Sequence, residues 1–177
     1  MSIRLVSWDV DGTLYSSFRL KLWLLGAARQ NILRVHRFHR CVEAQRRNPN
    51  CKADANELLQ FTDIQARERE WILAALTNLR PRPSAIDLLQ RFASAGIPQV
   101  ALSDFECGYK LEALGLDSYF LKTYSCQQLG FWKPSAIPLA HIQRELGIQP
   151  HEHLHIGDRP DTDGESCSRN GCQFLLL

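Results

Sequence analysis

Two acidic residues near the start of the chain stand where they could act together on a ligand. Asp9 and Asp11 come at the end of an apolar segment, Ile3 to Val10, and Gly12 follows them. If that segment is a buried strand, both carboxylates project into the crevice at the carboxyl edge of an open α/β sheet, where ligands bind. A structural role in an Asp-Gly turn suits Asp11 but not Asp9, because an acid at the end of a buried strand is costly.

Three further motifs follow in order along the chain. They contain Ser103 at the end of VALS, Lys133 in GFWKP, and the acidic residues Asp158 and Asp163 in GDRPDTD. Together with the hexapeptide DVDGTL at 9–14, they resemble the four motifs of the haloacid dehalogenase superfamily, whose first motif is DxDGT. Any one of these residues alone would carry little weight, but the four motifs together cover the whole predicted core.

The resemblance implies phosphoryl chemistry with a catalytic group of Asp9, Asp11 and Lys133. A phosphate monoester is anionic, so a carboxylate nucleophile can approach it only if cations offset the repulsion. Asp9 would attack phosphorus and form an aspartyl phosphate. Asp11 would protonate the leaving oxygen and then deprotonate the attacking water. Lys133 would bridge the nucleophile and the phosphoryl oxygens.

The resemblance also implies a metal site and a phosphate site. Mg²⁺ prefers hard oxygen ligands. The implied metal group comprises Asp9, Asp11 through its backbone carbonyl, Asp158 and Asp163. In the phosphate site, Ser103 and backbone N–H groups would donate hydrogen bonds to phosphoryl oxygens, Lys133 would add its charge, and Thr13 would steady the loop. The implied phosphate-binding group comprises Gly12, Thr13, Ser103 and Lys133.

Asp11, the second acid of the first motif, distinguishes the kinds of reaction that members of the superfamily catalyse. Dehalogenases that resemble this scaffold lack it and need no metal, and phosphonatases have a small residue at that position. Asp11 therefore favours a phosphatase acting on a phosphorylated small molecule or a phosphoprotein. The alternatives are a phosphomutase or other phosphotransferase on the same core, and a non-catalytic binding module of the same fold. The latter is best supported by Asp104, an acid beside Ser103 where many relatives have Asn, which weakens anion binding unless it points away or pairs with a base.

The elements that must position these residues form an α/β core with a Rossmann-like parallel sheet. After the first strand, short apolar runs predict strands, and capped amphipathic segments between them predict helices. Strands that alternate with helices of about ten residues imply βαβ units. The predicted strands cover 99–103, 119–124, 153–156 and 174–177, and the predicted helices cover 84–95, with Ser84 as its cap, 106–114 and 135–146. The catalytic core is expected to comprise 1–14 and 84–177.

Residues 15–83 contain no strand signal and predict a helical insertion, which resembles the cap of the superfamily. Apolar residues fall roughly on one stripe and Asn48-Pro49-Asn50 interrupts the helices. Within it, residues 17–47 carry eight Lys or Arg against one acid, Glu43. This segment is either a solvated basic face or a surface that attracts an anionic substrate or polyanion. The stripe comprises Leu20, Trp23, Leu24, Ala27, Val35, Phe38 and Val42, then Leu58, Leu59, Ile72, Leu73 and Leu76.

Composition agrees with a folded domain in the cytoplasm. The 177 residues are 45% hydrophobic and 23% charged, which excludes disordered and low-complexity classes. The net charge of +2 is too small to suggest nucleic-acid binding as the main function. The six cysteines are scattered and lack zinc-type spacing, which favours reduced thiols. No segment has the pattern of a signal peptide or membrane helix, and the sequence says nothing about oligomeric state.

Overall fold

A five-stranded parallel sheet forms the centre of the protein. The computed structural model describes residues 2–27, 29–48 and 50–177. The strand order is β3-β2-β1-β4-β5 and every neighbouring pair is parallel, which confirms the predicted α/β fold. All four residues of β1 are buried, as expected for the central strand. The strands are β1 (Leu5–Trp8), β2 (Gln99–Ser103), β3 (Lys122–Ser125), β4 (His153–Gly157) and β5 (Gln173–Leu176).

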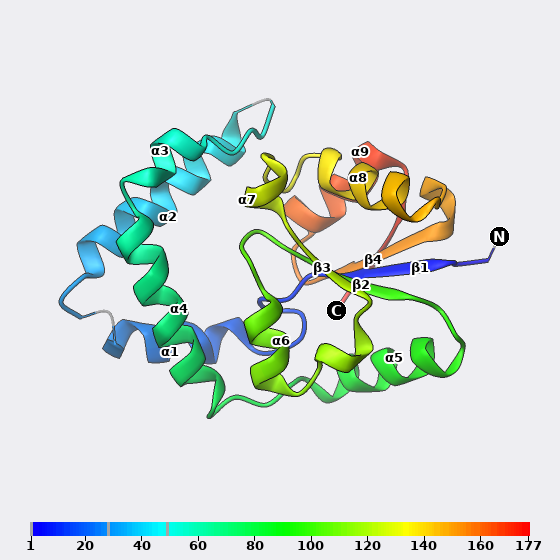
Figure 1. Ribbon diagram of the computed structural model, residues 1–177, viewed down its shortest axis with the longest axis horizontal. Coiled ribbons are helices and arrows are strands. Elements are labelled where there is room, and N and C mark those ends of the chain that lie inside the picture. Colours follow the sequence, from blue (N-terminus) through cyan, green and yellow to red (C-terminus); the bar gives the residue numbers. More distant parts are fainter. Residues whose placement is uncertain (1, 28, 49) are drawn as a thin grey trace.

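Helices cover both faces of this sheet, with α5 and α6 on one side and α8 and α9 on the other (Figure 1). Alternate residues of the strands divide between two hydrophobic clusters. Val6 and Trp8 pack with Leu89 of α5, whereas Leu5 packs with Leu139 of α8. The core helices are α5 (Pro83–Ser94), α6 (Gly108–Leu114), α7 (Cys126–Leu129), α8 (Ile137–Leu146) and α9 (Glu165–Asn170), and the short turns are η1 (Asp117–Tyr119), η2 (Pro150–Glu152) and η3 (Pro160–Gly164).

Several predicted boundaries differ from the structure by a few residues, and two of these differences have identifiable reasons. The strand expected at 119–124 begins only at Lys122, because the turn η1 precedes it and the aromatic side chains there pack into a core cluster without joining the sheet. Helix α5 begins at Pro83 with Arg82 as its N-cap, so Ser84 is not the cap. Proline at the first helical position has its φ preset and needs no hydrogen-bond partner for nitrogen.

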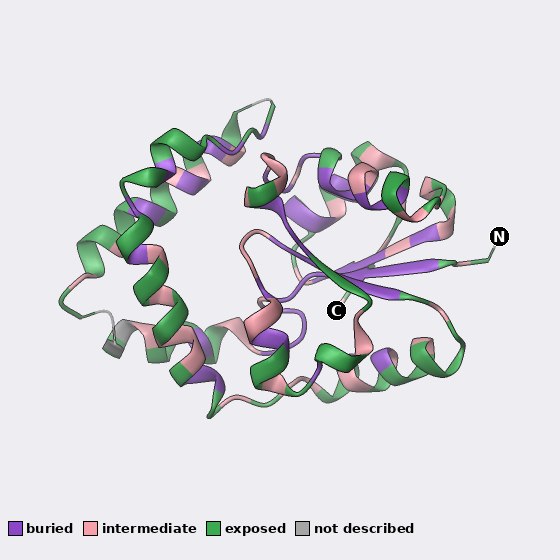
Figure 2. Cartoon of the chain, viewed as in Figure 1, coloured by how far each residue is buried: buried purple, intermediate pink, exposed green. Residues whose placement is uncertain are grey.

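The part of 9–82 that the structure describes contains four helices, namely α1 (Ser17–Ala27), α2 (Ile32–Arg47), α3 (Ala55–Leu59) and α4 (Thr62–Leu76). They form an arm beside the sheet, and their exposed faces appear green in Figure 2. Phe38 and Phe61 are buried between them, with ring centroids 5.6 Å apart. Helix α2 ends at Arg47, where the break was expected, although Pro49 lies outside the described residues.

The predicted apolar stripe of this arm is only partly correct. Phe38 and Val42 are buried, but Trp23 is 38% exposed and Leu59 is 69% exposed. The side chain of Ala27 lies outside the described residues. Leu20, Leu58 and Leu76 are also buried, so the stripe holds for side chains that face the interior of the arm or the core and fails for those that face outward. Among the described residues, no helix has both the length and the hydropathy to span a membrane.

One buried side chain joins the arm to the core. The Gln45 Oε1 atom of α2 accepts hydrogen bonds from the indole nitrogen of Trp132 at 2.9 Å and from the backbone nitrogen of Asp54 at 3.1 Å. Next to it, the backbone nitrogen of Trp132 donates to the Cys51 carbonyl at 2.7 Å. These bonds fix the loop that carries Lys133, the residue that follows Trp132.

We expect the substitution Gln45→Leu to lower the free energy of unfolding by about 1–3 kcal/mol, because it leaves the buried indole N–H of Trp132 and the partly buried backbone N–H of Asp54 without an acceptor. Urea denaturation monitored by circular dichroism measures this change. Gln90→Leu, at an exposed position of α5, is the matched control and should change stability by less than about 0.5 kcal/mol. Equal effects of the two substitutions would show that Gln45 does not join arm and core.

Candidate active site

Three carboxylates converge at the carboxyl edge of the sheet. Asp9 follows β1, Asp158 follows β4, and Asp163 lies in the turn η3. One oxygen from each carboxylate lies within 4.8 Å of the other two. The strands end side by side, so residues distant in sequence meet at the same edge. This cluster contains three of the four acids expected to hold a metal.

Lys133 neutralises part of this negative charge. Its Nζ atom lies 2.6 Å from Asp9 Oδ1 and 2.7 Å from Asp163 Oδ1, and its side chain is only 3% exposed. A buried ammonium group is costly unless it is paired with opposite charge. Burial would lower the pKa of Lys133, but the two carboxylates outweigh it and raise the pKa well above its usual value. Lys133 therefore remains charged between them.

The carboxyls of the cluster differ in acidity. Burial raises the pKa of Asp9 to about 7, and repulsion from Asp163 adds to this although Lys133 opposes it. Burial also favours the neutral form of Asp163, but there Lys133 and a hydrogen bond from His155 hold the pKa below its usual range. Burial and the charge of Asp163 raise the pKa of Asp158. The site thus carries more negative charge than Lys133 balances.

The loop after β1 fixes the orientation of Asp9. The Thr13 hydroxyl is fully buried and donates a 2.9 Å hydrogen bond to Asp9 Oδ2, so each Asp9 oxygen has its own donor. Gly12 has φ +104°, and a Cβ atom at that position would clash with the Asp158 carboxylate. Glycine is therefore required both for the turn and for the close approach of Asp158. Thr13 thus holds Asp9 in place, and Gly12 lets Asp158 approach.

Asp11 lies apart from the three-carboxylate cluster. Its two oxygens lie 2.8 Å and 2.6 Å from Lys110 Nζ, and the Tyr15 hydroxyl donates to it as well. Ser103 Oγ is 3.4 Å from Asp11 Oδ2. Burial alone would raise the pKa of Asp11, but the charge of Lys110 outweighs burial and lowers it. The side chain of Asp11 is thus held as an anion by its own cation.

Lys110 lies outside the four sequence motifs. Its place on an apolar helix face is nevertheless a sign of an unusual role. It is buried on α6 on the same face as Cys107 and Leu111, where the helical period places apolar residues. A lysine on such a face needs a buried anion nearby. The sequence could therefore have indicated the need for a partner, but not that the partner is Asp11.

Asp104 pairs with a base. Arg46 of α2 donates to the Asp104 carboxylate and also pairs with Glu43. The acid beside Ser103 therefore does not stand uncompensated in the site. This pairing removes the observation that favoured a non-catalytic binding module.

A hydrogen-bonded chain of buried side chains supports Asp163 from behind. His155 Nε2 lies 3.1 Å from Asp163 Oδ1, and because a carboxylate only accepts, this nitrogen carries the proton. His155 Nδ1 then accepts from the Ser7 hydroxyl at 2.7 Å, and Ser7 accepts from His153 at 2.8 Å. Burial lowers the pKa of His153 to about 3 and also lowers that of His155. Both imidazoles are neutral, and the chain orients Asp163 without adding charge.

A cleft of about 360 Å³ opens above these groups. From the core it is lined by the three clustered carboxylates, Lys133, Asp11, Ser103 and Lys110, and from the arm by side chains that include Lys21, His39 and Arg46. Of the eight Lys and Arg at 17–47, all of which the structure describes, only Lys21 and Arg46 line this cleft. Arg34, by contrast, pairs with Asp63 at 2.6 Å on the surface of the arm. Arm and core thus both contribute charged side chains to the cleft around Asp9.

Known proteins resemble the chain in sequence and structure. A glyceraldehyde 3-phosphate phosphatase of Methanopyrus kandleri is 25% identical over 203 aligned positions, which span 96% of this chain and 81% of that protein. A phosphatase structure from Thermococcus onnurineus covers 100% of this chain and 86% of its own, with 20% identity and a TM-score of 0.76. A predicted phosphoglycolate phosphatase from Haemophilus somnus covers the same shares, with 20% identity and a TM-score of 0.74.

These structural likenesses show a shared fold. The family model described as haloacid dehalogenase-like hydrolase matches residues 3–171, which include the loop after β1, Lys133 and the acids after β4. The chain therefore belongs to the haloacid dehalogenase-like hydrolase family.

Proposed function

We propose that this protein is a magnesium-dependent phosphatase that hydrolyses a phosphorylated small molecule through an aspartyl phosphate on Asp9. The observation that carries the proposal is the Asp9 carboxylate, which Lys133 and Thr13 orient at the floor of a cleft between core and arm. The names of the Methanopyrus and Haemophilus relatives, which denote phosphatases of small molecules, support this class of substrate.

Asp9 is the proposed nucleophile. An Asp9 oxygen attacks phosphorus, the bond from phosphorus to the ester oxygen breaks, and the alcohol leaves. Lys133 balances the charge of the phosphoryl oxygens as they approach the carboxylate. Water then attacks the aspartyl phosphate, which releases phosphate and restores Asp9. Thr13 holds the other carboxylate oxygen in place through both steps.

The donor set at the carboxyl edge fits Mg²⁺. Three carboxylates with oxygens within 4.8 Å of one another are hard ligands, and their combined charge exceeds that of Lys133. Asp9, Asp158 and Asp163 would hold the ion, with the backbone carbonyl of Asp11 as the further ligand that the family pattern implies. When bound, the ion supplies positive charge that offsets the repulsion between these carboxylates and the phosphate.

Asp11 is the proposed proton carrier, and Lys110 affects its two roles differently. As an anion, Asp11 is suited to accept a proton from the attacking water. Donation to the leaving alcohol requires a protonated Asp11, which the ion pair with Lys110 opposes. The leaving-group test below separates these two roles.

We further propose that residues 15–83 act as a cap over a core of 1–14 and 84–177. The arm supplies Lys21, His39 and Arg46 to the cleft while the core supplies the reacting groups. In this division, the arm chooses the substrate and the core performs the reaction. Localisation in the cytoplasm stays a prediction of the sequence.

Hydrolysis of a generic aryl phosphate should require a divalent cation, because the carboxylate cluster would otherwise repel the substrate. Dialysis against EDTA should abolish phosphate release, and added Mg²⁺ should restore it. A thermal unfolding scan in EDTA controls for loss of the fold. Full turnover in chelator with the protein still folded would contradict a metal-dependent mechanism.

The substitution Asp9→Asn should reduce phosphate release by on the order of 10⁴-fold or more while the protein stays folded, since the amide is nearly isosteric but is not a nucleophile. Steady-state kinetics and mass spectrometry of the trapped phosphoenzyme measure the loss. Asp117→Asn, at an exposed turn away from the cleft, is the control and should retain activity. A wild-type rate in the Asp9 variant would exclude Asp9 as the nucleophile.

The substitution Asp11→Asn tests which proton transfer Asp11 performs. If it is the general acid, the first step should slow by roughly 10²–10⁴-fold for an alkyl phosphate but much less for an aryl phosphate, whose phenolate leaves without a proton. If it acts only as the base, the burst of released alcohol or phenolate should stay rapid and only phosphoenzyme breakdown should slow. Rapid-quench measurement of the burst separates these outcomes, and an equal loss of burst rate for both leaving groups would assign Asp11 to organising the site.

A further inference from the structure

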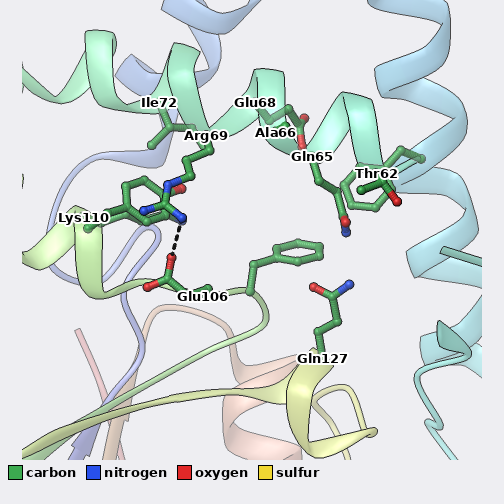
Figure 3. A pocket seen from close by; sticks show the side chains of 12 residues that line it. Thr62, Gln65, Ala66, Glu68, Arg69, Ile72, Glu106, Lys110 and Gln127 are labelled. Carbon is green, nitrogen blue, oxygen red and sulfur yellow. Dashed lines mark ion pairs between the residues drawn. The ribbon is translucent and has the colours of Figure 1, made fainter. Parts of the chain in front are cut away.

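A second cavity of about 370 Å³ lies beside the active-site cleft, between α4 of the arm and the start of α6 (Figure 3). Four residues line both spaces, namely Glu68, Ile72, Phe105 and Lys110. The cavity therefore adjoins the active-site cleft at these four side chains. A substrate whose phosphate lies at Asp9 can extend its organic part past Lys110 into this cavity.

The walls of the cavity are largely aromatic and apolar. Phe38 and Phe105 contact each other with ring centroids 5.5 Å apart, and Phe105 also packs edge-on against Trp132. On the other side, the Arg69 guanidinium lies 4.5 Å from the centroid of the Tyr109 ring. Such aromatic walls favour a substrate with a flat ring, since ring faces stack well against aromatic side chains.

Two amide side chains meet in this apolar surrounding. Gln65 extends from α4 and Gln127 from α7, and their amide ends point toward each other in Figure 3. The Gln65 Nε2 atom is buried and has no hydrogen-bond partner among the described residues. A buried donor left unpaired costs about 1–3 kcal/mol, so a ligand acceptor there would be favourable. Each amide offers both a donor and an acceptor, which suits a ring edge that carries both.

The charges around the cavity are already paired. Arg69 lies 3.5 Å from Glu106, and Lys110 forms its ion pair with Asp11. The two cations that line the cavity thus have partners within the protein. This arrangement disfavours a second anionic group on the substrate and favours an uncharged organic part.

We propose that this cavity binds the base of a nucleoside 5′-monophosphate and so selects nucleotides as the substrate class. The proposal rests on the phosphatase activity proposed above. The phosphate lies at Asp9 and Lys133, the sugar passes Lys110, and the base stacks on the aromatic wall with its edge toward Gln65 and Gln127. Gln65 and Gln127 take no part in the chemical step.

The kinetic test compares the four ribonucleoside 5′-monophosphates with glycerol 3-phosphate, which has no ring, in the presence of Mg²⁺. At least one nucleotide should have a kcat/KM about tenfold or more above that of glycerol 3-phosphate. In Gln65→Leu, the loss of kcat/KM for that nucleotide should exceed the loss for glycerol 3-phosphate by about tenfold, chiefly through KM. Gln128→Leu, at the exposed neighbour of Gln127, is the matched control and should leave the ratio between the substrates unchanged.

Equal losses for both substrates in Gln65→Leu would overturn the proposal, as would glycerol 3-phosphate hydrolysis that exceeds the hydrolysis of every nucleotide. A separate measurement keeps the cavity testable if the phosphatase proposal fails. Isothermal titration calorimetry with the unphosphorylated nucleosides reports on the cavity without any turnover. Binding by the wild-type protein that Gln65→Leu weakens would support the cavity assignment even for an inactive protein, and absence of binding by the wild type would overturn it.

Discussion

The buried ammonium of Lys133 between Asp9 and Asp163 is the interaction on which the rest of the site depends. Without it, acids that follow two neighbouring strands could not approach each other at this depth, because the desolvation and repulsion of buried carboxylates would push them apart. Lys133 reaches this position because Trp132 is anchored to Gln45 and to the Cys51 carbonyl. The arm therefore contributes to the active site before any substrate arrives, since it fixes the loop that carries the lysine.

The crowding of the carboxylates also explains why β1 and β4 carry polar side chains in the sheet behind the site. His155 orients Asp163, Ser7 orients His155, and His153 completes the chain, all with neutral groups. An apolar β4 would have left the buried Asp163 with Lys133 and one long backbone contact as its only donors. Fully satisfied buried networks of this kind hold side chains in one conformation, which suits Asp163 as the charge partner of Lys133 and as a proposed metal ligand.

Features set by local sequence could be predicted, whereas pairings set by helix packing could not. Asp9 and Ser103 lie at the edge of the sheet because they stand at the ends of strands. Gly12 is required because its turn has a positive φ angle. The pairs formed by Asp11 with Lys110 and by Asp104 with Arg46 join residues 99 and 58 positions apart. They depend on where α6 and α2 pack, which no short pattern encodes. The strand predicted at 119–124 begins too early because aromatic residues are buried both in strands and in packed turns.

The surroundings of Asp9 and Asp11 thus shift the pKa values of these two carboxyls in opposite directions. Burial raises the pKa of Asp9 to about 7, whereas Lys110 lowers the pKa of Asp11. A cation placed beside Asp9, Asp158 and Asp163 would lower the pKa of Asp9 and make it an anion at neutral pH, as a nucleophile must be. Asp11 needs no such help because it has its own lysine. The surroundings of the pair therefore suit the two roles proposed for them, with Asp9 as a carboxylate that shares Lys133 with Asp163 and Asp11 as an anion held by Lys110.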